Sequence, residues 1–311
     1  MPDPAISVIM VDGGFRESFR ALDYFSRQTL EPHRYELIWV EYTGQPAPQV
    51  ERRGGVRTFC LGRQDEPQIL GYAYNKGIAE ARGDILVIPD GDVACEPDLL
   101  EQIEREHQQC QDLVLYVLRL DQPRDRSKEH WDLDHLKATC SLKHTYNFGG
   151  CTTVRRKWLL EMNGYEQLPF FAGYHYLDGD NYVRFKNMGL KIKWLPTHNV
   201  YHPWHTLPPP PKFSTTAQQQ EFIARRAAGW DWVAYDGIDP AKNRRWNPDA
   251  PIPTEWPRIR TESGLLTRKG VFSLRLPRES FARRALSFFP RHGVAGGMRR
   301  LWQKLIEGWA E

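Results

Sequence analysis

Residues 83–96 read GDILVIPDGDVACE, which describes a buried strand that ends in two carboxylates. The run 85–88 is continuously apolar, as is typical of a strand buried on both faces. Pro89 cannot donate a ladder hydrogen bond, so the strand is expected to end there. Asp90 and Asp92 follow, and two facing carboxylates repel each other unless a cation lies between them. Oxygen ligands at the end of such a strand predict a Mg²⁺ or Mn²⁺ site, the alternative being a plain turn into the next helix.

Strands and helices alternate along the first two thirds of the chain. Apolar, β-rich runs are separated by segments of helical periodicity, and they lie at residues 5–11, 35–41, 56–61, 113–120 and 148–154. This alternation predicts an α/β fold with a mostly parallel sheet. The run LPPPP at residues 207–211 fits neither a helix nor a central strand. We therefore expect a catalytic domain over residues 1–206 and a C-terminal extension over residues 207–311, rich in Pro and Trp and ending in a basic amphipathic helix.

Composition narrows the class of protein. The formal net charge of +3 is small for a dedicated nucleic-acid binder, so no nucleic-acid partner is expected. The five cysteines form no C-x-x-C pair, which indicates free thiols in a reducing compartment and no zinc site. We find neither a signal-peptide pattern nor an apolar run long enough to cross a bilayer. These features predict a cytoplasmic protein.

Several spaced motifs lie between residues 5 and 205. The first are ISVIMV from Ile6 and ALDYFSRQTLEPHRYELIWVE from Ala21. The most specific is GYAYNKGIAEARGDILVIPDGDV from Gly71, in which Asn, Gly and Ala-Arg-Gly precede an apolar strand and a D-x-D motif. A further stretch is NGYEQLPFFAGYHYLDGDNYVRFKNMGLKI from Asn163. Together these motifs resemble the inverting family 2 glycosyltransferases, which have the GT-A fold, and the last stretch is similar to the segment of the family that faces the acceptor.

The resemblance implies a GT-A domain that moves a sugar from a nucleotide-diphosphate sugar to a hydroxyl of a glycan or glycolipid, with inversion, as in polysaccharide biosynthesis. A retaining transferase on the same fold stays open, because D-x-D does not distinguish the two outcomes. A catalytically silent protein that binds glycans or assembles partners is a further alternative. A nucleotidyltransferase is disfavoured, since the glycine-rich phosphate loop of such enzymes is absent after the first strand.

The resemblance also assigns roles to individual residues. Asp92 is the first candidate metal ligand, and Asp90 is expected to bind the ribose, the metal ion or its water shell. His202 and His205 stand where the family often places a metal-binding histidine, and a histidine ligand favours Mn²⁺ over Mg²⁺. Asp178 matches the catalytic base of the family, although an N-cap is the plain alternative. Asp180 is the next candidate base.

The chain departs from the family pattern on the donor side. Glu41-Tyr42-Thr43-Gly44 replaces the usual Asp-Asp-Gly-Ser, yet Glu41 can still accept a hydrogen bond from a base or ribose. Asp12 either contacts the nucleotide or caps the following helix. Asn75 is a further candidate for nucleotide binding. Arg184 is expected either to pair with a carboxylate or to approach the diphosphate.

Three other groups of residues suggest further roles. Four aromatic residues are each either core residues or sugar-stacking faces, namely Tyr174, Tyr176, Trp194 and Trp204. Residues 121–146 and the segment after His205 are expected to close over the site when donor and metal bind.

Apolar residues from Val294 to Trp309 form one face of a helix beside an arginine-rich stretch. This face predicts either peripheral attachment to an anionic membrane or packing on the catalytic domain or a second copy, as in a homodimer.

Overall fold

The computed structural model describes residues 3–14, 16, 18–65, 68–127, 132–144, 147–173, 176–206, 216–251, 259–261 and 264–266. Its strands are β1 (Ile6–Asp12), β2 (Tyr35–Glu41), β3 (Val56–Cys60), β4 (Ile85–Pro89), β5 (Ala94–Cys95), β6 (Leu113–Asp121), β7 (Cys151–Arg155), β8 (Lys191–His202), β9 (Ile259–Thr261) and β10 (Gly264–Leu266). Its helices are α1 (Ala21–Ser26), α2 (Pro48–Glu51), α3 (Gly71–Glu80), α4 (Leu99–Gln109), α5 (Leu133–Thr139), α6 (Arg156–Glu161), α7 (Leu177–Met188) and α8 (Thr216–Ala228). Short 3₁₀ turns lie at Pro32–Arg34, Arg124–Arg126, Pro169–Phe171 and Pro240–Lys242.

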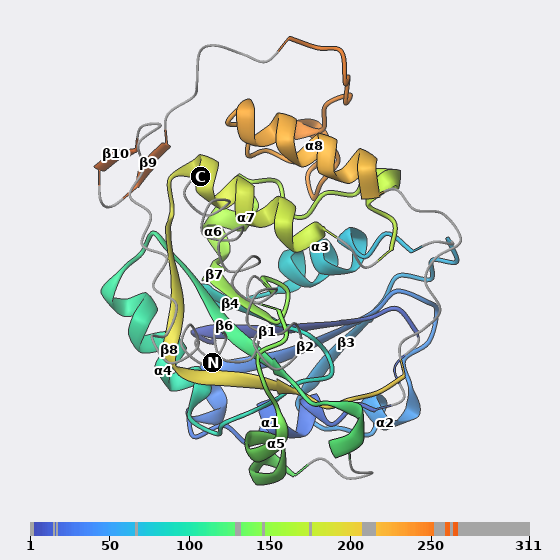
Figure 1. Cartoon of the computed structure of the whole chain (residues 1–311), viewed down its shortest axis with the longest axis vertical. Coiled ribbons are helices and arrows are strands. Elements are labelled where there is room, and N and C mark those ends of the chain that lie inside the picture. The colour runs from blue at the N-terminus through green and yellow to red at the C-terminus, as the bar shows by residue number, and fades with distance from the viewer. Residues whose placement is uncertain are drawn as a thin grey trace, which may run out of the picture. The chain divides into compact units, whose positions relative to one another are not determined.

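A central sheet of eight strands has the order β3-β2-β1-β4-β7-β6-β8-β5 (Figure 1). β1 runs parallel to β2 and β4, β2 runs parallel to β3, and β6 runs parallel to β8. β7 is antiparallel to both of its neighbours, and β5 is antiparallel to β8. The expected α/β fold is thus confirmed, and the sheet is mixed. The buried strand quoted first, β4, lies near the middle of the sheet, as its apolar run predicts.

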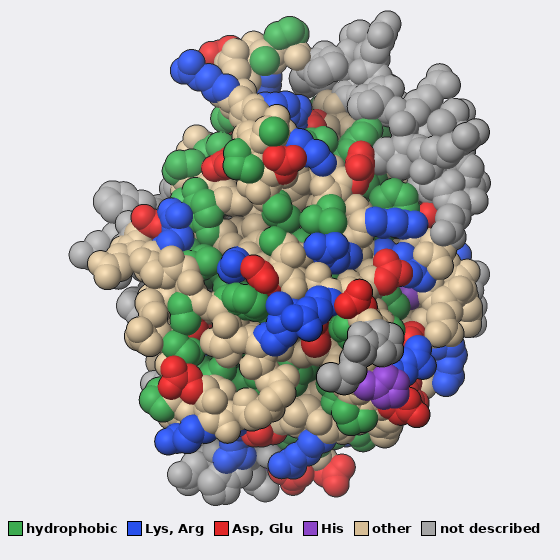
Figure 2. Space-filling view, turned by 180° about the vertical axis from the view of Figure 1, so that it is seen from behind, with side chains coloured by type: hydrophobic (Ala, Val, Ile, Leu, Met, Phe, Trp, Pro, Cys, Tyr) green, Lys and Arg blue, Asp and Glu red, His purple; other side chains and the backbone are tan. Residues whose placement is uncertain are grey.

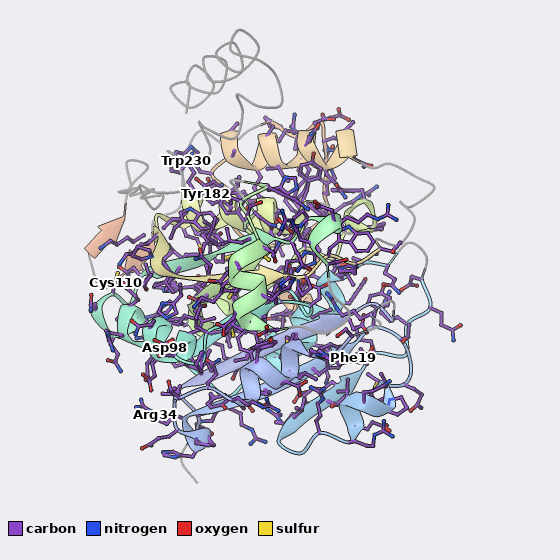
Figure 3. The ribbon with its side chains drawn as sticks, turned by 60° about the horizontal axis from the view of Figure 1, so that its bottom comes forward. Phe19, Arg34, Asp98, Cys110, Tyr182 and Trp230 are labelled. Carbon is purple, nitrogen blue, oxygen red and sulfur yellow. The ribbon has the colours of Figure 1, made fainter. Side chains whose placement is uncertain are left out.

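Helices cover both faces of the sheet. α3 packs on β1 and β2, α6 on β7 and α7 on β8, while α1, α4 and α5 pack on the opposite face. Figure 3 shows Tyr182 and Trp230 on the α7 side of the sheet and Phe19 on the α1 side. A large buried cluster of apolar residues fills the α1 side and includes Met10, Phe25, Trp39, Leu99 and Ile103. A sheet covered on both faces explains why the strands are apolar along their whole length.

Some elements differ from their sequence-based prediction. Residues 15–28 have a helical period in the sequence and predict one helix, but in the described chain the helix is limited to α1. The sequence also predicts two short closing strands at residues 191–195 and 199–202, and these form the single strand β8. Its pairing with β6 shifts register between Tyr116 and Leu118. Pro196 lies at that irregularity, where the N–H that proline lacks is not needed for a hydrogen bond between the strands. The segment expected to be irregular at residues 121–146 contains α5, whose N-cap Asp132 accepts from the backbone N–H of Asp134 at 3.2 Å.

Residues beyond position 206 also contribute to the packing. α8 lies against α7, and the buried ring of Phe222 contacts Phe170, Phe171, Tyr235 and Trp246. Acidic and basic side chains are interspersed over the face shown in Figure 2. Within the described ranges, no helix has the length and apolarity needed to cross a bilayer. The amphipathic segment predicted from Val294 lies outside the described residues.

Candidate active site

The carboxyl edge of the sheet collects the acidic residues that the sequence singled out. Asp12 ends β1 and Glu41 ends β2, and the two are register partners. Asp90 and Asp92 follow β4, which runs parallel to β1. Because parallel strands end at the same edge, residues far apart in the sequence meet here. This edge is where open α/β sheets bind ligands.

Asp92 forms a possible metal site with both predicted histidines. One ligand atom from each of Asp92, His202 and His205 lies within 4.8 Å of the other two. The Nε2 of His202 is 3.5 Å from Asp92 Oδ1, and the Nε2 of His205 is 3.3 Å from Asp92 Oδ2. β5 pairs with the end of β8 and so places His202 beside the loop that carries Asp92. A carboxylate with two imidazoles is a donor set that fits Mn²⁺ or a similar divalent ion.

A carboxylate that the sequence did not single out orients His202. The Oδ1 of Asp121 lies 3.1 Å from Nδ1 of His202, and the two residues are register partners in β6 and β8. A carboxylate on the second ring nitrogen fixes the tautomer and orientation of a metal-binding histidine. The sequence held one signal for this role, the position of Asp121 at the end of an apolar strand. The pairing of β6 with β8 is needed to show that the histidine it contacts is His202.

Asp90 lies outside this three-residue group. Its Oδ2 is 2.6 Å from Nη1 of Arg119, and Nη2 of the same arginine is 3.1 Å from Asp121 Oδ1. Burial raises the pKa of Asp90 even though Arg119 acts in the opposite direction. The structure thus brings Asp90 together with Arg119, which the sequence had not singled out. Metal ligation by Asp90 stays a prediction, as does its contact with the donor.

The possible metal ligands have strongly perturbed proton affinities. Burial alone would raise the pKa of Asp92, but Arg16 and the two histidines hold it well below its usual range. Burial acts to lower the pKa of His202, yet its hydrogen bonds to Asp121 and Asp92 raise that pKa to about 9. Arg16 forms an ion pair with Asp92 and is another residue that sequence reasoning missed. The negative charge of the Asp92 carboxylate is therefore balanced by Arg16 and the two histidines.

Asp178, the predicted base, lies in the first turn of α7. A Cβ added at Gly149 would collide with Asp178 Oδ2 where it now lies, so the loop at Gly149 passes directly beside the carboxylate. Burial, followed by the charge of Asp90, raises the pKa of Asp178 to about 7. A carboxyl group with this pKa can accept a proton near neutral pH, which suits a general base.

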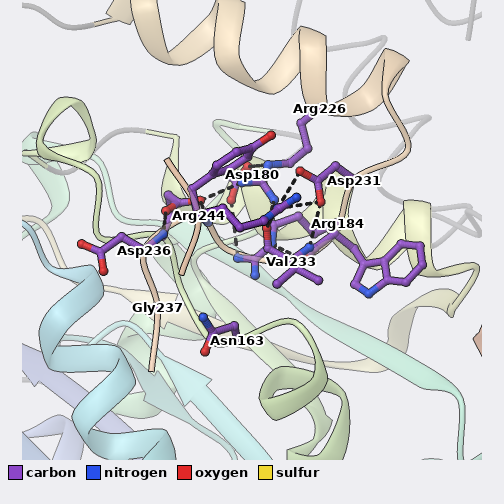
Figure 4. Close-up of polar contacts among 12 residues, drawn as sticks. Asn163, Asp180, Arg184, Arg226, Asp231, Val233, Asp236, Gly237 and Arg244 are labelled. Carbon is purple, nitrogen blue, oxygen red and sulfur yellow. Dashed lines mark hydrogen bonds and ion pairs between the residues drawn. The ribbon is translucent and has the colours of Figure 1, made fainter. Parts of the chain in front are cut away.

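Asp180, the alternative base, belongs to a buried network of ion pairs behind α7, shown in Figure 4. The Nε of Arg226 is 2.9 Å from Asp180 Oδ1, and Nη1 of Arg184 is 3.5 Å from Asp180 Oδ2. Arg226 also binds Glu166 at 2.7 Å. Of the two roles expected for Arg184, the pairing with a carboxylate is the one present here. This network ties α7, which carries Asp178, to residues beyond position 206.

The three predicted nucleotide contacts on the donor side are engaged with neighbouring groups. The amide of Asn75 donates to the carbonyl of Tyr165 at 2.8 Å and accepts from its N–H at 2.6 Å. Glu41 accepts from Trp39 Nε1 at 2.7 Å, and burial raises its pKa to about 7. Asp12 accepts from the N–H of Gly14 at 3.1 Å. Both polar atoms of Asn75 are thus used in holding the loop after α6, and we leave Asn75 out of the donor site proposed below.

The aromatic candidates fall into separate groups. Trp194 is buried in the core, while Tyr176 is 37% exposed. Trp204 lies under the guanidinium of Arg124 at 5.2 Å, and Tyr174 is outside the described residues. Beside Asp178, Phe148 and Tyr182 are stacked with their ring centroids 4.2 Å apart. Sequence reasoning missed this half-buried pair, because Phe148 reads as part of a strand.

Comparisons with known proteins agree with this architecture. Residues 53–162, about a third of the 311-residue chain, match the model of Glycosyl transferase family 2. The crystal structure of S. aureus TarS 1–349 has a TM-score of 0.51 at 13% identity, covering 72% of this chain and 64% of that chain. TarS in complex with UDP has the same TM-score at 14% identity. GalNAc-T7 with UDP, GalNAc and Mn²⁺ has a TM-score of 0.54 at 14% identity, covering 77% of this chain and 53% of that chain.

At these identities the structural likeness shows the fold, which is GT-A. The chain spans less than two thirds of the TarS and GalNAc-T7 chains. No curated protein sequence matches the chain. The family match and the shared fold together support a glycosyltransferase.

Proposed function

We propose that the protein transfers a sugar from a nucleoside diphosphate sugar to an acceptor hydroxyl, with a divalent metal ion and with inversion of the anomeric centre. The observation that carries this proposal is the pairing of two separate groups at one edge of the sheet. Asp92, His202 and His205 form a set that fits a metal ion, and the carboxylate of Asp178, on helix α7, interacts electrostatically with Asp90.

Asp92, His202 and His205 would hold the metal ion, with Asp121 orienting His202. When bound, the ion neutralises the charge that develops on the leaving diphosphate. The structure of GalNAc-T7 with UDP, GalNAc and Mn²⁺ supports a donor of the UDP-sugar type and favours Mn²⁺ over Mg²⁺. Asp12, Glu41 and Asp90 lie at the same edge and are our candidates for contacts to the nucleoside.

Asp178 would act on the acceptor. Its ionised carboxylate takes the proton of the acceptor hydroxyl as that oxygen bonds to the anomeric carbon and the bond from that carbon to the diphosphate oxygen breaks. A pKa of about 7 lets the group be ionised before transfer and still basic enough to receive the proton. The Phe148–Tyr182 pair next to this carboxylate offers an apolar face for an acceptor ring.

The test begins with a thermal-shift screen of nucleotide sugars with and without Mn²⁺, because a ligand that binds only the native state raises the melting temperature. Donor hydrolysis or transfer is then measured with the best ligand, and NMR of the product assigns the anomeric configuration. We expect a Mn²⁺-dependent shift, turnover and an inverted product. Retention would replace the single-displacement mechanism, and absence of binding and turnover with every donor would favour a silent glycan-binding protein.

The Mn²⁺-dependent rise in melting temperature caused by the donor is expected to require Asp92. Asp92→Asn keeps the shape of the side chain but removes its charge, so Mn²⁺-dependent donor binding should be lost. The stability of the free protein should change little, because relieving the repulsion between Asp90 and Asp92 offsets the lost pairing with Arg16. Calorimetric titration that shows unchanged Mn²⁺-dependent binding would remove Asp92 from the metal site.

A further inference from the structure

Arg16 lies at the point where the metal ion and the donor diphosphate would meet. Its Nη1 pairs with Asp92 Oδ2, and its Nε is 3.4 Å from the carbonyl of Val11 and 3.8 Å from Asp12 Oδ1. The side chain is only 12% exposed. A Cβ at Gly91 would be 2.8 Å from the Nε of Arg16, so the glycine of the D-x-D motif makes room for the guanidinium.

The guanidinium and a metal ion would share the carboxylate of Asp92. Asp92 Oδ2 contacts both Arg16 and the Nε2 of His205, which is 3.3 Å away. An ion held by Asp92 and both histidines would come close to the guanidinium, and two cations at that separation repel each other strongly in a partly buried site. Metal binding therefore has to weaken the Arg16–Asp92 pair.

Arg16 remains at the donor side of the sheet when this pair is broken. Its Nε lies beside the carbonyl of Val11 in β1, so a rotation of the guanidinium can release Asp92 while the stem stays at the carboxyl end of β1. A guanidinium presents a planar fork of donors that matches phosphate oxygens in a bidentate manner. A donor diphosphate bound at this edge would offer such oxygens.

We propose that Arg16 competes with the metal ion for Asp92 and, once displaced, binds the diphosphate of the donor. The inference rests on the proposed function and adds to it a phosphate-binding residue and a coupling between metal and nucleotide. Because the nucleotide engages the displaced arginine, it raises the affinity for the metal ion, and the metal ion raises the affinity for the nucleotide by the same factor.

The experiment measures both affinities for the wild type and for Arg16→Gln. Mn²⁺ binding without nucleotide is followed by the electron paramagnetic resonance signal of free Mn²⁺. Nucleotide binding at saturating Mn²⁺ is measured by calorimetry with the tightest binder among UDP, GDP, CDP and dTDP. We expect Arg16→Gln to bind Mn²⁺ about tenfold more tightly and the nucleotide about tenfold more weakly, since charged hydrogen bonds are lost in each case. If either affinity equals that of the wild type, the proposal is overturned.

Two further variants keep the result interpretable. Arg16→Lys retains the charge but not the fork, so Mn²⁺ affinity should stay near the wild-type value while nucleotide affinity falls. Unchanged nucleotide affinity in Arg16→Lys overturns the proposal even if Arg16→Gln fails to fold. Arg53→Gln is the matched control, because Arg53 pairs with Asp23 at 2.7 Å between α1 and α2 and should leave both affinities unchanged.

The same titrations separate this inference from the proposed function. Loss of Mn²⁺ binding in Asp92→Asn, with wild-type behaviour of Arg16→Gln, removes the role of Arg16 and leaves the metal site in place. If Asp92→Asn binds Mn²⁺ and nucleotide like the wild type, the proposed metal site is wrong, and the competition for Asp92 falls with it.

Discussion

Two clusters of carboxylates and cations lie on either side of Asp178, and they differ in how far they are open to solvent. In the cluster around Asp92, the side chains of Asp92, His202 and His205 are 14%, 15% and 36% exposed. In the network behind α7, Asp180, Arg184 and Glu166 have no exposed surface, and Arg226 is 1% exposed. The same residue types thus occur in one cluster that a ligand can reach and in one that is sealed.

The partners of the two clusters differ as well. Asp92 is shared by Arg16 and two histidines, all of which have other possible partners at the edge of the sheet. The sealed arginines instead bind backbone carbonyls, Arg184 that of Trp232 at 2.8 Å and Arg226 that of Val233 at 3.1 Å. Glu166 accepts from the N–H groups of Tyr235 and Asp236. The open cluster can exchange partners with a ligand, whereas the sealed one fixes a chain segment to the helix that carries the base.

The largest effect is expected on the open side. Asp178→Asn should lower turnover about 10²- to 10⁴-fold, because general-base catalysis contributes that much. Donor and metal binding should persist, since Asp178 is not among the possible metal ligands. The measurement is transfer at saturating donor and Mn²⁺, with calorimetry of donor binding as the control. Near-normal turnover would move the base to another residue.

The sealed cluster should show the opposite pattern, with a loss of stability. Arg226→Met leaves Asp180 and Glu166 buried without their shared cation, which should cost about 3–5 kcal/mol of unfolding free energy. Urea denaturation measures this cost. The matched control is Lys76→Gln, which removes a half-exposed pair with Glu80 and should cost about 0.5 kcal/mol. Equal costs for the two variants would contradict the distinction between the clusters.

The open cluster was largely predictable from the sequence, and the sealed one was not. The apolar strand, the D-x-D motif and the resemblance to family 2 led to Asp92 and the two histidines, whose ligand atoms lie within 4.8 Å of one another. The role of Asp178 as the base stays a prediction. Strand direction explains this success, because residues at the ends of parallel strands meet at one edge. Arg16, Arg119 and Asp121 were missed, since an arginine or aspartate near a turn carries no local signal of its partner.

The sealed cluster depends on contacts between distant segments. Asp180 and Arg184 are one helical turn apart and suggest a pair, but Glu166 and Arg226 are separated by 60 residues. The Pro-rich stretch after His205 predicted a domain boundary, and nothing in the sequence indicated that Arg226 returns to the helix bearing the base. Burial of charge is set by tertiary packing, which periodicity and composition do not encode.

The rate of sugar transfer is expected to depend on pH, and this effect should be of intermediate size. Asp178 accepts a proton only when ionised, so transfer should rise about tenfold per pH unit below a pKa of about 7 and level off above it. Asp90→Asn removes a negative charge that raises this pKa and should move the midpoint to lower pH. The measurement is the pH profile of kcat/KM at saturating Mn²⁺. A midpoint that stays in place in Asp90→Asn would contradict the electrostatic interaction of Asp90 with Asp178.

The raised pKa of Asp178 also makes the free energy of unfolding depend on pH. The folded-state pKa of Asp178 lies above the unfolded value of about 3.9, so the native chain binds more protons between these two pH values. Its contribution therefore makes the protein less stable as pH rises through that window. Asp178→Asn should remove this slope from the urea-unfolding profile, and an unchanged slope would assign the proton uptake to another group, such as Glu41.

The smallest effect is expected at Tyr176, the N-cap of α7. Its backbone has φ of +65°, a left-handed conformation that costs a non-glycine residue on the order of 1 kcal/mol. Its hydroxyl accepts a hydrogen bond from Gln220 of α8 at 2.9 Å, so the exposed ring also joins the base-bearing helix to the segment beyond position 206. Tyr176→Gly should relieve the backbone cost and lose the ring contact, and the two changes nearly cancel in unfolding free energy.

Tyr176→Asn separates the two contributions, because asparagine tolerates the left-handed conformation and lacks the ring. If the ring contact helps to place Asp178, both variants should lower kcat severalfold at unchanged KM for the donor and with similar stability. Equal kcat in the wild type and both variants would show that the sealed cluster alone positions the base, which would sharpen the contrast between the two sides of α7.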